Sequence, residues 1–181
     1  MARLARVVVG TSGSPGSLAA LRYAEFLARS HDAVLVPVLA WEPPGGDRAA
    51  QVQPVAGLAQ AWRELACERM RDALAQVWGE TVTDALVEPR VERGPAGWVL
   101  VNVANRSGDV LVLGAGRRGV LRRAACRVSR YCAARATCPV VLVPPPDLAA
   151  EIRRARVAWR LRHRTLTPAQ VLSNHRNPAS R

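Results

Sequence analysis

The chain has 181 residues and a net charge of +12, and all 26 of its basic residues are arginine. This length suits one well-buried domain with a tail and is too short for two domains of ordinary size. Its apolar runs are much shorter than the roughly 20 residues that a membrane-spanning helix needs, and the first residues show no secretion signal. We therefore expect a soluble, cytoplasmic protein without a membrane span.

The positive charge is concentrated in two parts of the chain. Residues 114–137 contain seven arginines and no acid, and residues 147–181 contain eight arginines and two acids. Such clusters favour an anionic partner, which is a nucleotide, a nucleic acid or a lipid headgroup. The alternative is a solvated basic face and tail that reflect a coding bias toward arginine. Only 4% of the residues are aromatic, which argues against a stacking platform for nucleic acid.

The four cysteines do not have the spacing of a metal site. Cys67, Cys126, Cys132 and Cys138 form no C-x-x-C pair and have no histidine companions at metal-ligand spacing. The sequence therefore predicts no metal site.

The first half of the chain alternates between strand and helix patterns. The apolar run 7–10 is typical of a buried parallel strand, and apolar residues at helical spacing follow it to about residue 30. A second strand is expected at 33–41, where Pro37 favours an edge position or a bulge. A loop rich in proline and glycine then leads to a helix predicted at 58–78.

The second half continues the same alternation. A strand is expected at 85–92, a helix at 95–105 and a strand at 109–113. A further helix is expected to end near residue 136, before a last strand at 138–143. Continuously apolar strands that alternate with amphipathic helices indicate an α/β domain whose parallel sheet is covered on both faces.

The order of the elements also indicates where a ligand site and a domain boundary lie. Ligands of such folds bind beyond the carboxyl ends of the strands, which places the loops 10–14 and 114–119 in one crevice. We expect the domain to span residues 1–146. Residues 147–181, which are basic and follow the last core strand, are expected to form a disordered or partly helical tail.

Residues 114–129, GAGRRGVLRRAACRVS, form a glycine-bearing turn of the kind that exposes backbone N–H groups to phosphate. Two arrangements of this segment are open. If the helix begins near Val120, no phosphate loop is left and Arg127 lies in mid-helix. If residues 117–125 form a loop, a helix N-terminus near Cys126 favours an anion there.

In their order and spacing, several segments resemble the universal stress protein family. They are VVVGTSGS (7–14), LAALR (18–22), AW (40–41), GPA (94–96), DVLVLG (109–114) and CPVVLV (138–143). The resemblance covers about residues 4–145. It implies a Rossmann-like three-layer sandwich with a five-stranded parallel sheet in the order 3-2-1-4-5. It also implies a homodimer that forms through the last strand, with Val140, Val141, Leu142 and Val143.

The nucleotide-binding branch of that family holds ATP with an aspartate after the first strand and with a loop of pattern G-x-x-G-x9-G-[S/T] after the fourth. By position, the resemblance implies nucleotide-binding roles for Gly10, Ser12, Ala40, Leu113, Gly114, Gly116, Cys126, Arg127, Val128 and Ser129.

This chain departs from the family pattern at three places. Ser12 replaces the aspartate, which weakens a ribose contact by about 1–2 kcal/mol. Gly114 and Gly116 are one residue closer than the pattern requires. Cys126 and Arg127 replace the Gly-Ser/Thr pair, so a side chain narrows the site, and Arg127 either bridges phosphate oxygens or points into solvent.

We therefore expect a dimeric stress-response or regulatory module with a degenerate ATP site and weak or absent nucleotide binding. No general base with a positioned partner lies near the crevice, so we expect no enzyme and no catalytic residues. The alternative is a functional ATP-binding universal stress protein. A weaker alternative is a protein that binds nucleic acid or an acidic surface through its arginines.

Overall fold

The computed structural model describes residues 3–43, 57–79, 85–115 and 122–144, and for residues 122–126 it describes the helical backbone alone. The chain divides into two units, Met1–Pro145 and Pro146–Arg181. All described residues belong to the first unit, so the predicted tail at 147–181 lies outside them. Within the described residues, no helix has the length and apolar character that crossing a bilayer requires.

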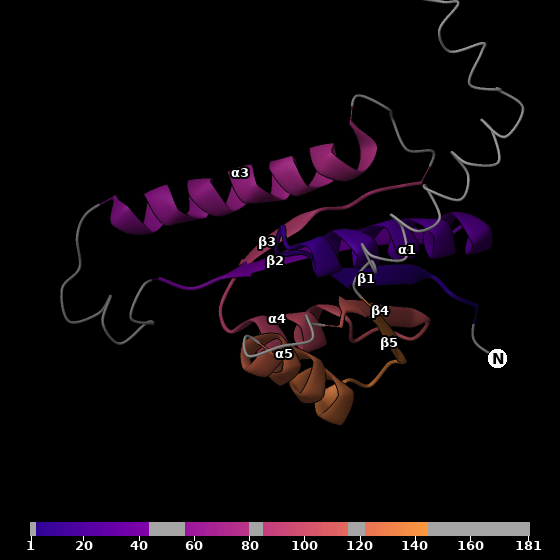
Figure 1. Cartoon of the computed structure of the whole chain (residues 1–181). Helices are drawn as coiled ribbons and strands as arrows, with labels where there is room; N and C mark the ends of the chain where they lie inside the picture. The colour runs from indigo at the N-terminus through magenta and orange to yellow at the C-terminus, as the bar shows by residue number, and fades with distance from the viewer. Residues whose placement is uncertain (1–2, 44–56, 80–84, 116–121, 145–181) are drawn as a thin grey trace, which may run out of the picture. The chain divides into compact units, whose positions relative to one another are not determined.

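The first unit is an alternation of strands and helices. In chain order its elements are β1 (Arg6–Gly10), α1 (Pro15–His31), β2 (Val34–Trp41), α3 (Leu58–Trp78), β3 (Arg90–Arg93), α4 (Ala96–Val103), β4 (Asp109–Gly114), α5 (Arg122–Arg135) and β5 (Val140–Val143). The strands pair in parallel in the order β3-β2-β1-β4-β5. Helices α1 and α3 cover one face of the sheet, and α4 and α5 cover the other (Figure 1). The predicted fold and strand order are confirmed.

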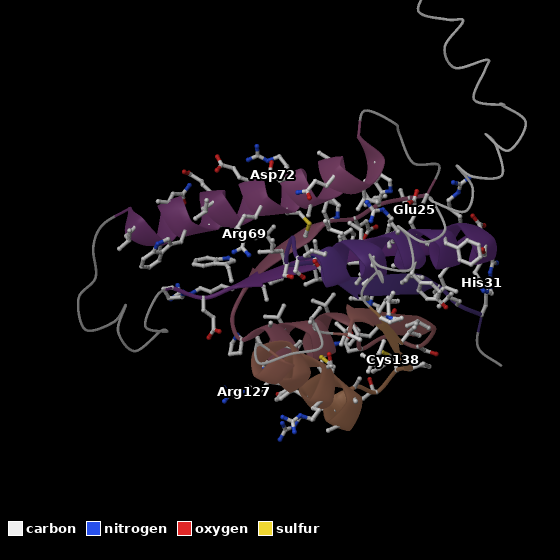
Figure 2. All side chains as sticks on the ribbon, in the orientation of Figure 1. Glu25, His31, Arg69, Asp72, Arg127 and Cys138 are labelled. Atoms are coloured by element: carbon white, nitrogen blue, oxygen red, sulfur yellow. The ribbon has the colours of Figure 1, made fainter. Side chains whose placement is uncertain are left out.

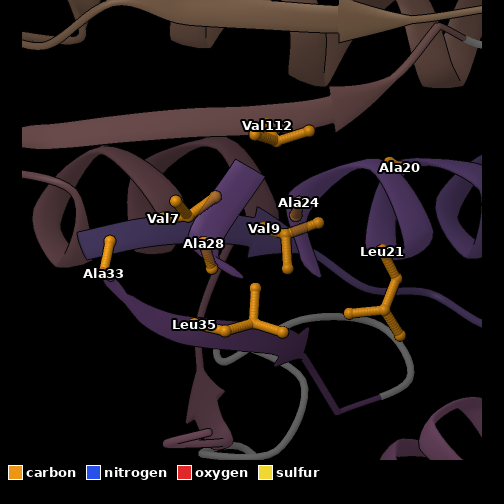
Figure 3. Packing of buried hydrophobic residues seen from close by; sticks show 9 residues of the cluster. All are labelled: Val7, Val9, Ala20, Leu21, Ala24, Ala28, Ala33, Leu35 and Val112. Atoms are coloured by element: carbon orange, nitrogen blue, oxygen red, sulfur yellow. The ribbon is translucent and has the colours of Figure 1, made fainter. Parts of the chain in front are cut away.

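Helix α1 packs on the centre of the sheet through small side chains. Ala20, Ala24 and Ala28 are fully buried at a helical spacing of four residues. Figure 3 shows these residues beside Val7 and Val9 of β1. Because alanine adds little bulk, the helix axis lies close to the strands. This packing fixes the N-terminus of α1 beside the carboxyl end of β1.

A buried ion pair joins the starts of β1 and β4. Arg6 Nε donates to Asp109 Oδ1 at 2.9 Å, and Arg6 Nη2 donates to Asp109 Oδ2 at 2.6 Å. The Arg6 side chain is 8% exposed and that of Asp109 is fully buried. Arg6 also donates to the Val103 carbonyl, and Asp109 accepts the Arg106 N–H. Since each charge has several partners, the pair is fully bonded in spite of its burial.

Pro37 was expected at an edge position or a bulge, and the edge alternative is wrong. Strand β2 lies between β1 and β3, so it is an inner strand. Leu35 bonds to the chain before β3 through both its N–H and its carbonyl, and alternation places the missing N–H of Pro37 on the same side. On that side the pairing has a gap between the Leu35↔Val87 bridge and the register that starts at Val38↔Arg90. The gap lies where an N–H of residue 37 would donate to the Glu88 carbonyl, so Pro37 costs the sheet one hydrogen bond of this ladder.

The same interruption shortens β3. A strand was expected at 85–92, but β3 begins at Arg90. Before it, a single bridge joins Val87 to Leu35. Because Pro37 on β2 has no N–H to donate toward this segment, the ladder is not continuous before Arg90, and the prediction of one strand at 85–92 is wrong in its bounds.

Candidate functional site

A cavity of about 440 Å³ opens at the carboxyl ends of the central strands. This is the edge where ligands of parallel α/β sheets bind. The loop after β1, the N-terminus of α1, the ends of β2 and β4, and three further helices surround it. The lining residues are Gly10, Thr11, Ser12, Ser14, Pro15, Gly16, Ser17, Val38, Leu39, Ala40, Arg69, Ala96, Leu100, Leu113, Gly114, Val128 and Ser129.

Serine hydroxyls hold the loop after β1. Ser14 is the N-cap of α1, and its Oγ accepts from Ser17 N at 3.3 Å. The Ser17 hydroxyl donates to Ser14 O at 2.9 Å and accepts from Ser12 N at 3.2 Å. The hydroxyls of Ser12 and Ser14 are 3.0 Å apart. Both lie at the cavity, so this wall offers two neighbouring hydroxyls beside a helix N-terminus.

Gly114 is required by close packing at the end of β4. A Cβ at this position would lie 2.5 Å from the Gly16 carbonyl oxygen and 3.0 Å from Ser17 N. Real Cβ atoms do not approach backbone atoms so closely. The contact between β4 and the first turn of α1 therefore needs a glycine, independently of any phosphate.

Arg69 of α3 lines the cavity, although the sequence analysis did not select it. Its Nη2 donates to the Ser12 carbonyl at 3.3 Å. Figure 2 shows Arg69 pointing from α3 toward the sheet, while Asp72 points the opposite way. Among the described residues, Arg69 is the one charged side chain of the lining. The sequence holds no signal that separates Arg69 from Arg71, since both adjoin the buried Met70 on α3.

The remaining wall is apolar. Val38, Leu39 and Ala40 form the end of β2, and Leu100 of α4 and Leu113 of β4 face the same space. Such a lining fits a small ligand that is mostly apolar and has a few polar groups on one side.

The family model of the universal stress protein family matches residues 4–144. The chain belongs to the universal stress protein family. A solved universal stress protein in complex with cAMP is 26% identical, with a TM-score of 0.51, over 80% of this chain and 99% of that chain. UspA from Lactobacillus plantarum is 21% identical, with a TM-score of 0.56, over 79% and 99%. A family member from Burkholderia pseudomallei is 23% identical, with a TM-score of 0.53, over 78% and 97%. No curated protein matches the chain.

In this universal stress protein, most of the ten residues expected at a nucleotide site meet at the cavity. Those that line it are Gly10, Ser12, Ala40, Leu113, Gly114, Val128 and Ser129. Arg127 is exposed and is not part of the lining, and Figure 2 shows it far from Arg69. Gly116 and the side chain of Cys126 lie outside the described residues.

Helix α5 resolves one of the alternatives left open by the sequence. It spans Arg122–Arg135, so Cys126 and Arg127 belong to its second turn. A loop over 117–125 with a helix N-terminus near Cys126 is therefore wrong. Residues 116–121 lie outside the described part, so the start near Val120 stays a prediction.

The two thiols near the α4–α5 face of this universal stress protein lie away from the cavity. Burial, followed by the neighbouring Cys138, raises the pKa of Cys132 to about 11. The pKa of Cys138 is also raised, first by burial and then by the charge of Asp109. Both thiols are therefore protonated at neutral pH, and neither lines the cavity. In the described ranges, no cluster of three metal-ligating side chains occurs.

Proposed function

We propose that this universal stress protein is a cytoplasmic, dimeric stress-response or regulatory module that binds ATP weakly or not at all. The observation that carries this proposal is the course of α5. From the fifth residue of an α-helix onward, each N–H bonds to a carbonyl four residues earlier. Because the described part of α5 already includes residues 122–127, the N–H groups of residues 126 and 127 are used inside the helix and are not free for phosphate.

The lining of the cavity supports a role without catalysis. The described lining residues include no histidine, cysteine or carboxylate, so no general base faces a bound ligand. Ser14 and Ser17 are engaged in capping α1. A binding module needs no more than this, whereas acyl or phosphoryl transfer needs a positioned base or metal.

Strand β5 supports the proposed homodimer. It is an edge strand that pairs with β4, and Leu142 on it is 48% exposed. An open edge with exposed apolar side chains is a ready surface for a second copy. We propose that Val140, Val141, Leu142 and Val143 form the contact.

Isothermal titration calorimetry with ATP tests the proposal. We expect weak or no saturable binding by the native chain. The double variant Cys126→Gly/Arg127→Ser is expected to gain affinity, because it opens the second turn of α5 and adds a hydroxyl. Ala133→Gly, an exposed position on the same helix, is the control for general loosening of α5. Tight binding of ATP by the native chain would overturn the proposed degenerate site.

The cavity favours a second function beside the first, which is binding of a smaller nucleotide. It is lined by most of the expected residues and has room for a nucleoside. The 26% identical universal stress protein was solved in complex with cAMP. We propose that the cavity of this chain binds a nucleoside that carries one phosphate.

A further inference from the structure

Arg69 has more hydrogen-bonding capacity than its contacts use. A guanidinium carries five N–H donors, and the described contact of Arg69 is one bond to the Ser12 carbonyl at 3.3 Å. Ion pairs among the described residues include those of Arg3 with Asp32, Arg6 with Asp109 and Arg90 with Glu88. Arg69 takes part in none of these pairs, so donors remain for a ligand on the cavity side.

The surroundings of Arg69 complete a site for a negative group. The Ser12 and Ser14 hydroxyls, 3.0 Å apart, lie on the same side of the cavity. The first turn of α1 contributes Gly16 to the lining, and the positive end of this 17-residue helix favours an anion. The guanidinium, two hydroxyls and a helix N-terminus thus face the same open cavity.

Ser12 places no negative charge beside Arg69. Its side chain is a neutral hydroxyl 3.0 Å from that of Ser14, while Arg69 bonds to the Ser12 carbonyl. The described lining contains no carboxylate, so the positive charge of Arg69 is available to a ligand.

The number of positive charges in the cavity lining decides how many phosphate groups the site can match. A triphosphate brings several negative charges, which other proteins match with several cations or with a metal ion. The described lining of this cavity has one cation and no carboxylate to hold a metal. A single phosphate matches one guanidinium, which can bind two of its oxygens in a bidentate manner.

We propose that Arg69, together with the Ser12 and Ser14 hydroxyls, binds the single phosphate of a mononucleotide and sets the preference of the cavity for such a ligand over ATP. The base then lies against the apolar wall that includes Ala40 and Leu100. This inference rests on the second proposed function, which is binding of a nucleoside with one phosphate. Both a cyclic phosphodiester and an open phosphomonoester carry one phosphate group that Arg69 could bind, so both are candidate ligands.

Calorimetric titrations with cAMP, 5′-AMP and adenosine test the role of Arg69. In Arg69→Ala, we expect the affinity for the phosphate-bearing ligands to fall about 10- to 100-fold, as for the loss of a charged hydrogen bond. Adenosine affinity is expected to stay unchanged, which also shows that the variant is folded. Arg69→Lys should lose less, because it keeps the charge without the bidentate geometry. Arg71→Ala removes an exposed charge from the same helix outside the lining and is the matched control.

The outcomes separate the two levels of the proposal. If the native chain binds all three ligands and Arg69→Ala binds them equally well, the role of Arg69 is overturned while the cavity remains a nucleoside site. If none of the three binds to the native chain, the second proposed function itself is overturned. Tighter native binding of cAMP than of 5′-AMP identifies the cyclic diester as the preferred ligand, and the reverse identifies the monoester; a loss of either ligand's affinity in Arg69→Ala supports Arg69 as the phosphate contact.

Discussion

Arg6 and Arg69 show two uses of arginine in a chain that has no lysine. Arg6 is buried, and its charge is matched by Asp109 through two hydrogen bonds. Arg69 is exposed on the cavity side and bonds to one carbonyl. The planar guanidinium suits both positions, because it donates in several directions at once. The first arginine stabilises the domain, and the second is available for a ligand.

Removing the partner of Arg6 is expected to destabilise the domain strongly. In Asp109→Asn, the buried guanidinium loses its negative partner, and we expect the free energy of unfolding to fall by about 3–5 kcal/mol. Urea denaturation followed by circular dichroism measures this change. Asp32→Asn is the control, because Asp32 pairs with Arg3 at an exposed site and should change the stability far less. Equal stabilities of the two variants would contradict the prediction.

At the scale of elements, periodicity predicted the helices and most strands because burial itself repeats with the helix or strand period. The predicted helix at 58–78 matches α3, and the strand at 109–113 matches β4 except for its last residue. The strand at 85–92 was misplaced, because the start of β3 depends on the N–H that Pro37 lacks on the neighbouring strand. Pairing between residues of two strands is a tertiary contact, which the local sequence pattern does not predict.

The candidate site was predictable in part for the same reason. Gly10 and Gly114 stand at strand ends, and strand ends are visible in the sequence. Arg69 was missed because it meets the Ser12 carbonyl across 57 positions of the chain. In the sequence, Arg69 looks the same as Arg71, which is exposed on the same helix. Only the packing of α3 beside the end of β2 distinguishes the two arginines.

The contact between β4 and α1 gives a prediction about one glycine. In Gly114→Ala, the new methyl group would press on the Gly16 carbonyl, so the first turn of α1 must move. We expect a loss of stability of about 1–3 kcal/mol and weaker binding of any ligand that contacts Ser14. Thermal melting and calorimetry measure the two effects.

Gly16→Ala is the matched control for this prediction. The nearest atom to a Cβ at position 16 is the Ala115 carbonyl oxygen at 3.7 Å, which is ordinary contact. Because alanine is favourable in the first turn of a helix, this variant should keep or raise the melting temperature. A Gly114→Ala protein as stable as Gly16→Ala would show that the contact is not tight.

At the scale of the whole molecule, the exposed apolar side chains are unevenly placed. Leu142 lies on the open edge of the sheet at β5, whereas Leu65 lies on the outer surface of α3. Both are about half exposed, but only the first is accompanied by an unpaired row of backbone groups. Assembly through the edge would extend the five-stranded sheet or pack two edges together.

Leu142→Arg is expected to convert a dimer into a monomer. The native chain should elute with the mass of two copies in size-exclusion chromatography with light scattering. In a two-fold dimer, the arginine on β5 of one copy would lie close to the same arginine on the other copy. The two like charges would repel each other and oppose the contact. Leu65→Arg adds the same charge at an exposed leucine of α3 and should leave the mass unchanged. A native chain with the mass of one copy would refute the proposed dimer.

The pairing gap between Pro37 and Pro89 has a consequence for the motions of the domain. Beyond the gap, β3 is joined to β2 by the register from Val38↔Arg90 to Trp41↔Arg93 alone, whereas β1 is paired on both sides. Amide protons of β3 should therefore exchange with solvent sooner than those of β1, through opening of the sheet edge without global unfolding. Helix α3 packs on this edge and contributes Arg69 to the cavity. The wall that carries Arg69 thus packs on an edge of the sheet that is expected to open without global unfolding, and a bound ligand would be expected to slow that exchange.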